Sequence, residues 1–184
     1  SIILNKKKNS FNILKKLKLK KNNFFLITLH RPDMVDNKKN LTNMINFFSK
    51  LSKTKNMKII FPIHPRTQKK IKLFKIKNFS NLEIINPCNY FDFLSLQKNA
   101  KIIFTDSGGI QEEACILNTP CITLRKNTER PETLKIKSNV LVGYNLKKIN
   151  LSLNKMLKSK IKWKNPYGNN VSNKILQILK KQYK

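Results

Sequence analysis

The sequence is poor in glycine, arginine and acidic residues, and it contains no long hydrophobic run. Its 184 residues include only 4 Gly, 9 acids and 4 Arg against 35 Lys, which gives a formal net charge of +30. No apolar run approaches the roughly 18 residues that a membrane-spanning helix needs. Hydrophobic residues make up 40% of the chain, so it is not a disordered polymer and can bury the core of one domain.

Cysteine is also scarce. Cys88, Cys115 and Cys121 form neither a CxxC pair nor an even framework, which argues against a disulfide scaffold or a zinc site. We expect reduced, buried thiols. The first residues place apolar side chains before the lysines, which is the reverse of a secretory signal. The sequence therefore predicts a cytoplasmic protein without a metal centre.

The positive charge is carried by lysines that are scattered through every segment. Proteins that read nucleic acids use arginine, because its guanidinium contacts phosphates and base edges in pairs. With so few arginines, we interpret most lysines as a solvated surface whose apolar stems lie along the protein. A basic nucleic-acid-binding module stays an alternative, and it would show steep salt dependence and indifference to nucleotides.

The rare residue types are concentrated in a few polar clusters. All four Arg, both His and one adjacent pair of Gly lie in His30-Arg31-Pro32, His64-Pro65-Arg66, Asp106-Ser107-Gly108-Gly109, Leu124-Arg125 and Glu129-Arg130-Pro131. A chain that uses lysine almost everywhere else is expected to need these residues at these positions.

Short apolar runs alternate with helical patterns from about residue 24 onward. Strands are expected at 24–28, 58–61, 82–85, 101–105, 121–124 and 140–142. Helices are expected at about 40–52, 68–74, 90–98, 110–117, 145–158 and 171–183. Nearly continuous β-branched strands separated by helices predict a parallel sheet covered on both faces. We therefore predict a doubly wound, Rossmann-like α/β domain.

The first twenty residues are expected to form a basic amphipathic helix. Its apolar stripe would consist of Ile3, Leu4, Phe11, Leu14 and Leu17.

Each polar cluster follows a predicted strand. His30 comes after the first strand, His64 after the second, Asp106 to Gly109 after the fourth and Arg125 after the fifth. The carboxyl ends of parallel strands open onto one crevice, so we expect these clusters to meet in space. Paired glycines at a helix start favour a phosphate cradle that uses free N–H groups and the helix dipole, although a plain tight turn is the alternative. The run is neither a GxGxxG fingerprint nor a Walker loop, which argues against NAD and ATP.

Several side chains beside this cradle are candidate ligands. Glu113 lies one turn into the helix, where a carboxylate can accept both hydroxyls of a ribose. Arg125 and Arg130 can supply cations to a diphosphate, or they can form surface salt bridges with Glu129 and Glu132. Phe93, on the preceding helix, can line a pocket for a base or belong to the core.

His30 and His64 are candidates for proton transfer or for contact with a charged leaving group, and a structural hydrogen bond is the alternative for each. No Cys or carboxylate stands at ligand spacing beside either histidine, so we expect no metal there.

These clusters, in this order, resemble the C-terminal domain of the non-hydrolysing UDP-N-acetylglucosamine 2-epimerases, which have a two-domain GT-B fold. The resembling segments are Thr28 to Pro32, Pro62 to Arg66, Thr105 to Glu113, Thr128 to Glu132 and Asn165 to Gly168. The third and fourth segments together are the most specific part of the resemblance.

The resemblance implies a reaction and a role for each site residue. UDP-N-acetylglucosamine and UDP-N-acetylmannosamine would be interconverted by elimination and re-addition of UDP, without a cofactor. Ser107, Gly108 and Gly109 would hold the diphosphate, Glu113 the ribose and Arg130 the phosphates. Phe93 would contact the uracil, and Arg31 would belong to the substrate-binding loop. His30 would be catalytic, beside the reacting sugar, and His64 would match an allosteric position that contacts a second UDP-sugar.

The resemblance also implies a division of the whole enzyme. Residues 1–20 would be a linking helix region and residues 21–184 the UDP-binding domain, whereas the catalytic carboxylates would lie in an N-terminal domain absent from this chain. The final helix would pack on that domain, a homodimer is left open, and the product would feed polysaccharide biosynthesis. Alternatives are a hydrolysing epimerase and a GT-B glycosyltransferase. One departure concerns Met34, because the family usually carries an asparagine there.

Overall fold

A single parallel sheet organises the chain. The computed structural model describes residues 12–77, 79, 81–158, 162–168 and 170–182. The strands are β1 (Phe24–Thr28), β2 (Lys58–Pro62), β3 (Leu82–Ile85), β4 (Ile102–Thr105), β5 (Cys121–Thr123) and β6 (Asn139–Leu141). They lie in the order β3-β2-β1-β4-β5-β6, and every neighbouring pair is parallel. This is the predicted doubly wound topology, and its switch point lies between β1 and β4.

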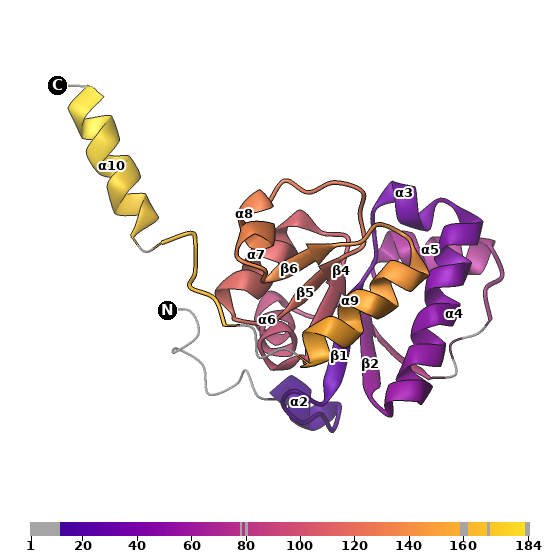
Figure 1. The fold of residues 1–184 in the computed structure, drawn as a ribbon. Helices are drawn as coiled ribbons and strands as arrows, with labels where there is room; N and C mark the ends of the chain where they lie inside the picture. The colour runs from indigo at the N-terminus through magenta and orange to yellow at the C-terminus, as the bar shows by residue number, and fades with distance from the viewer. Residues whose placement is uncertain (1–11, 78, 80, 159–161, 169, 183–184) are drawn as a thin grey trace.

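Helices cover both faces of the sheet, as Figure 1 shows. They are α2 (Asn12–Lys16), α3 (Pro32–Val35), α4 (Lys38–Lys55), α5 (Pro65–Leu73), α6 (Tyr90–Asn99), α7 (Gly108–Ile116), α8 (Pro131–Lys135), α9 (Leu146–Lys158) and α10 (Val171–Gln182). Side chains of α4, α5 and α9 pack against one face, and those of α2, α6 and α7 pack against the other.

The strands alternate their side chains between two hydrophobic cores. In β1, Phe25 and Ile27 face the core under α4 and α9, whereas Phe24 and Leu26 face the core under α6 and α7. All four are completely buried. A strand that is buried on both faces reads as a continuous apolar run, which is why the sequence predicted these strands correctly.

Two short helices were not predicted. Both α3 and α8 begin with a proline, Pro32 and Pro131, at the first helical position. Proline is well suited to that position because its ring fixes a helical φ and the missing N–H would be unpaired there anyway.

The expected helix over the first twenty residues is only partly present. Within the described residues it spans Asn12–Lys16, and Lys18 has a left-handed φ of 50°, so residues 17–20 are not helical as predicted. Leu14 is buried and Leu17 is partly buried, in agreement with the predicted stripe. Ile3, Leu4 and Phe11 lie outside the described residues.

Trp163 connects the C-terminal segment to the sheet domain. Trp163 donates its indole N–H to the carbonyl of Cys115 at 2.9 Å. Beyond that point α10 projects away from the body of the domain and has no buried residue (Figure 1). Its apolar residues Val171, Ile175, Leu176, Ile178 and Leu179 are each about half exposed. No helix among the described residues is long and apolar enough to span a membrane.

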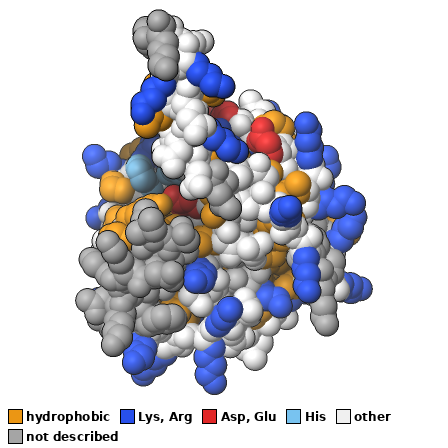
Figure 2. All heavy atoms as spheres, turned by 90° about the vertical axis from the view of Figure 1, so that its left-hand side faces the viewer, with side chains coloured by type: hydrophobic (Ala, Val, Ile, Leu, Met, Phe, Trp, Pro, Cys, Tyr) orange, Lys and Arg blue, Asp and Glu red, His pale blue; other side chains and the backbone are white. Residues whose placement is uncertain are grey.

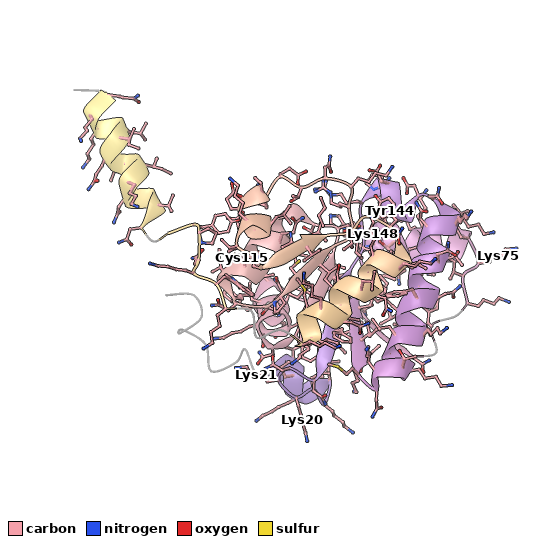
Figure 3. All side chains as sticks on the ribbon, viewed as in Figure 1. Lys20, Lys21, Lys75, Cys115, Tyr144 and Lys148 are labelled. Atoms are coloured by element: carbon pink, nitrogen blue, oxygen red, sulfur yellow. The ribbon has the colours of Figure 1, made fainter. Side chains whose placement is uncertain are left out.

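Lysine and arginine side chains are spread around the surface. Figure 2 shows them scattered over one face, with acidic side chains among them. Lys20, Lys21 and Lys75 point away from the body of the domain in Figure 3. This distribution agrees with the interpretation of the lysines as a solvated surface.

Candidate functional site

The loops after β1 and β4 are joined by one buried carboxylate. Asp106, directly after β4, is 1% exposed. One of its oxygens accepts the backbone N–H of His30 at 2.8 Å and that of Arg31 at 2.9 Å. Its other oxygen lies 2.8 Å from Nδ1 of the His30 imidazole. The two clusters that the sequence placed at strand ends therefore do meet at the carboxyl edge of the sheet.

His64 lies beside His30 at the start of α5. The ring centroids are 5.4 Å apart and the ring planes are inclined by 40°. His64 is the N-cap of α5, and its Nδ1 accepts the backbone N–H of Arg66 at 3.1 Å. Partial burial, followed by the charges of His30 and Arg66, lowers the pKa of His64 below its ordinary value. The structural hydrogen bond considered for this residue is thus present.

Both histidines line a cavity of about 310 Å³. The remaining lining residues are apolar or uncharged: Thr28, Leu29, Pro62, Ile63, Pro65, Pro87, Cys88, Phe93 and Ile110. Phe93 also packs against the core under α6, which agrees with the interpretation of this residue as part of the core. In the space-filling view a histidine is visible at the surface, with hydrophobic and acidic side chains close to it (Figure 2).

The three cysteines are free. Burial raises the pKa of the Cys88 thiol in the cavity, and it raises that of Cys121 to about 12. Cys115 and Cys121 are buried as expected, whereas Cys88 is only half-buried. The Cys88 side chain forms part of the cavity wall.

The start of α7 forms an open cradle. Ser107 is the N-cap, but its side chain makes no capping hydrogen bond. Gly109 is exposed, and a Cβ added to it would meet no described atom within 4 Å. The first N–H groups of a helix have no partner within that helix and carry its positive dipole end. The site can therefore receive an anion against backbone N–H groups.

Each arginine of the loop after β5 is paired with a carboxylate. Arg125 makes two hydrogen bonds of 2.7 Å to Glu129, and this guanidinium holds the pKa of Glu129 at about 2. Arg130 donates from Nε to Glu112 of α7 at 2.8 Å, instead of pairing with an acid of its own loop. A Cβ on Gly108 would lie 3.1 Å from a Glu129 oxygen, so this loop packs directly against the cradle.

A buried polar network that we did not predict positions this loop. Gln111 of α7 is completely buried, and its amide oxygen accepts hydrogen bonds from Thr128 and from Asn139. Asn139 donates in addition to Thr133 and accepts from Thr123. Gln111 is the sequence feature that could have indicated this network, because a glutamine on the buried side of a short helix needs hydrogen-bond partners for its amide.

Glu113 is also held in place by a residue that sequence reasoning missed. Gln97 of α6 is completely buried and donates to one Glu113 oxygen at 2.6 Å. Burial, followed by the Glu113 carboxylate, raises the pKa of the neighbouring Tyr90. Gln97 therefore fixes the Glu113 carboxylate against α6. Glu113 itself belongs to α7, the helix whose N-terminus forms the cradle.

Met34, which replaces the asparagine usual in the family, lies in α3 after β1. Its side chain is completely buried in the core under α4, within α3. Here the position serves packing and not ligand contact.

The Arg31 Nε atom is buried and has no hydrogen-bond partner among the described residues, so it can donate to a ligand. No group of three or more His, Cys, Asp or Glu in the described part of the chain is placed to hold a metal ion.

Comparison with known proteins identifies this arrangement. The family model for UDP-N-acetylglucosamine 2-epimerase matches residues 2–180. The UDP-N-acetylglucosamine 2-epimerase of Methanococcus maripaludis is 47% identical over 161 residues, which are 85% of this chain and 44% of that protein.

Solved structures agree with this match. The Methanocaldococcus jannaschii UDP-GlcNAc 2-epimerase in complex with UDP-GlcNAc and UDP has a TM-score of 0.87 and 44% identity, over 97% of this chain and 50% of its own. The Neisseria meningitidis enzyme bound to UDP-GlcNAc has a TM-score of 0.80 and 29% identity, over 98% of this chain and 51% of its own. The chain thus spans about half the length of these relatives, and the predicted fold class, a Rossmann-like half of a GT-B fold, is confirmed. It belongs to the UDP-N-acetylglucosamine 2-epimerase family.

Proposed function

We propose that this chain is the UDP-binding half of a UDP-N-acetylglucosamine 2-epimerase, which interconverts UDP-GlcNAc and UDP-ManNAc. The observation that carries the proposal is the open α7 N-terminus, which stands at the same sheet edge as the His30–Asp106 pair and the cavity. An anion cradle beside a titratable side chain suits a substrate that reacts next to its own diphosphate.

Each site residue has a role in this proposal. Ser107, Gly108 and Gly109 receive the diphosphate on backbone N–H groups, and Arg130 stabilises its charge from the loop held by Gln111. The reaction removes the C2 proton, expels UDP and then adds UDP back after reprotonation from the other side. Stabilising the departing diphosphate is the part of this work that the cradle performs.

The remaining residues contact the nucleoside, the sugar or an activator. Glu113 accepts the ribose hydroxyls with the orientation that Gln97 gives it, and Phe93 contacts the uracil from the cavity wall. Arg31 donates its free Nε to the substrate, His30 exchanges protons beside the sugar, and His64 contacts a second UDP-sugar.

The nucleotide site is tested by calorimetry with UDP and with pyrophosphate at fixed physiological salt. A chain with a net charge of +30 attracts any polyanion, so the preference for UDP is the meaningful quantity. We expect UDP to bind at least about tenfold more tightly, because the ribose adds hydrogen bonds to a charged carboxylate. We expect the Glu113→Ala variant to lose most of this preference.

Glu83→Ala is the matched control for charge. It removes an equivalent acid from β3, where Glu83 pairs with Lys58 at 3.0 Å. This variant should keep the preference of the wild type for UDP. Equal binding of UDP and pyrophosphate by the wild type, abolished by added salt, would contradict the proposed function.

The second half of the enzyme is proposed to cover the cavity and to supply the catalytic carboxylates. None of the cavity-lining residues is an Asp or Glu, and the nearby Asp106 is engaged in three contacts. The exposed apolar stripe of α10 suits contact with that half, because exposed contiguous apolar surface marks an interaction site. Whether the complete enzyme is a dimer is open to measurement of its mass in solution.

The purified chain alone is therefore expected to bind UDP without epimerising UDP-GlcNAc. Proton NMR of the sugar C2 position in deuterated water measures this directly, because each turnover exchanges that proton for deuterium. Exchange by the chain alone would overturn the proposed division of labour. Addition of the N-terminal half of a close relative should restore exchange, and release of free ManNAc in that mixture would indicate a hydrolysing enzyme instead.

We also propose a cytoplasmic location. The free thiols of Cys88, Cys115 and Cys121 support it, because reducing compartments keep cysteines in this form.

A further inference from the structure

The two histidines at the cavity differ in what their Nδ1 atoms contact. Nδ1 of His30 faces a carboxylate oxygen of Asp106 at 2.8 Å. Nδ1 of His64 faces a backbone N–H, that of Arg66, at 3.1 Å. A carboxylate can only accept a proton in such a contact and an amide N–H can only donate one. The two imidazoles are therefore placed in environments that favour opposite tautomers.

The environment of His30 favours a proton on Nδ1. The Asp106 oxygen that faces the imidazole is buried and has no hydrogen-bond partner among the described residues, and Nδ1 of His30 lies 2.8 Å from it. A buried carboxylate oxygen without a donor costs free energy, and the Nδ1–H of His30 is the group placed to supply one. The other Asp106 oxygen is already engaged by the backbone N–H groups of His30 and Arg31.

The environment of His64 is the reverse. Its Nδ1 must be unprotonated to accept the N–H of Arg66, so in the neutral ring the proton resides on Nε2. Partial burial and the nearby His30 lower the pKa of His64, which favours the neutral ring.

We infer that Asp106 is a positioning residue that fixes His30 with its proton on Nδ1, while the start of α5 fixes His64 with its proton on Nε2. The rim of one cavity then presents two Nε2 atoms of opposite character, an acceptor on His30 and a donor on His64. A proton that arrives on Nε2 of His30 creates an imidazolium whose charge is balanced by Asp106. The use of these nitrogens on a UDP-sugar rests on the proposed function, whereas the tautomers themselves do not.

Long-range proton–nitrogen NMR correlation on the full, nitrogen-15-labelled chain tests the inference. The chain contains only two histidines, so His30→Gln and His64→Gln variants assign the ring signals completely. We expect the neutral rings of the ligand-free wild type to show opposite patterns, Nδ1–H for His30 and Nε2–H for His64. Two identical tautomers in the wild type would overturn the inference.

The Asp106→Asn variant separates positioning from structural support. The amide oxygen of Asn can still accept the two backbone N–H groups, which leaves its NH₂ group facing Nδ1 of His30. We expect His30 to switch to the Nε2–H tautomer while His64 and the folded spectrum stay unchanged. In a serine-protease triad, the same exchange inverts the histidine tautomer and lowers turnover by about 10⁴-fold.

Asp33→Asn is the matched control. It removes an equal charge from an exposed position in α3, three residues after His30, and both tautomers should remain as in the wild type. A switch of His30 in this control, or none in Asp106→Asn, would overturn the positioning role. UDP titration of the same samples keeps the two proposals distinct. Opposite tautomers without UDP binding would refute only the nucleotide site, and UDP binding with identical tautomers would refute only the role of Asp106.

Discussion

The Gly109→Asp variant is expected to lose UDP and pyrophosphate binding while becoming more stable. Gly109 lies in the first turn of α7, where an added side chain meets only open space. A carboxylate there interacts favourably with the helix dipole, which stabilises the fold by about 0.3–1 kcal/mol. Replacing a glycine within a helix stabilises it by about 0.5 kcal/mol more. The same carboxylate would repel a diphosphate about 4 Å away by up to roughly 4 kcal/mol, which corresponds to a loss of about 100-fold or more in affinity.

Calorimetry and denaturant unfolding on the same samples measure these opposite effects. The Gly109→Asn variant is the isosteric control, because it adds the same volume without the charge. It should lose about tenfold or less in affinity, since only steric crowding remains. If Gly109→Asp binds UDP as well as the wild type does, the diphosphate does not lie on the N-terminus of α7.

The Phe104→Ala variant is expected to lose about 3–5 kcal/mol of unfolding free energy. Phe104 is completely buried in β4 and contacts two other rings edge-on. Its ring centroid lies 5.8 Å from that of Phe25 in β1 and 5.0 Å from that of Phe48 in α4. Because it joins the two central strands to the covering helix, its removal leaves a cavity that few neighbours can fill. A domain at the lower end of the ordinary range of about 5–15 kcal/mol would then be close to unfolding.

Urea unfolding followed by circular dichroism measures this loss. The Leu151→Ala variant on α9 is the control, because Leu151 is 69% exposed and its truncation should change stability by less than about 0.5 kcal/mol. A loss below about 1 kcal/mol for Phe104→Ala would mean that this core is not packed as described.

The strands and the long helices were determined by local sequence. β1 and β4 were predicted as strands because they are buried on both faces, so every side chain before the final threonine is apolar. The position of each polar cluster after a strand then fixed which loops would meet, because all parallel strands end at one edge. That argument needs only the order of the strands and helices along the chain, which the apolar runs and helical patterns of the sequence indicate.

The short helices and the N-terminal segment were beyond local patterns. A helix of four or five residues, such as α3 or α8, has too few turns to show a periodicity, and its starting proline is equally typical of a loop. Lys18 adopts a left-handed φ that is uncommon for a residue with a side chain, so the end of α2 carried no signal. Packing against α6 decides where that segment lies.

The sequence alone proposed the site residues, and the tertiary structure decided which of their atoms remain available. The resemblance and the clustering pointed to Glu113, Arg130 and His30, but their partners Gln97, Glu112 and Asp106 come from other turns or other elements. Hydrogen bonds between such partners depend on distances of a few tenths of an ångström, which no local pattern encodes. Residue types therefore determine the chemistry that is possible, and the packing of the elements determines which proton or lone pair is left to perform it.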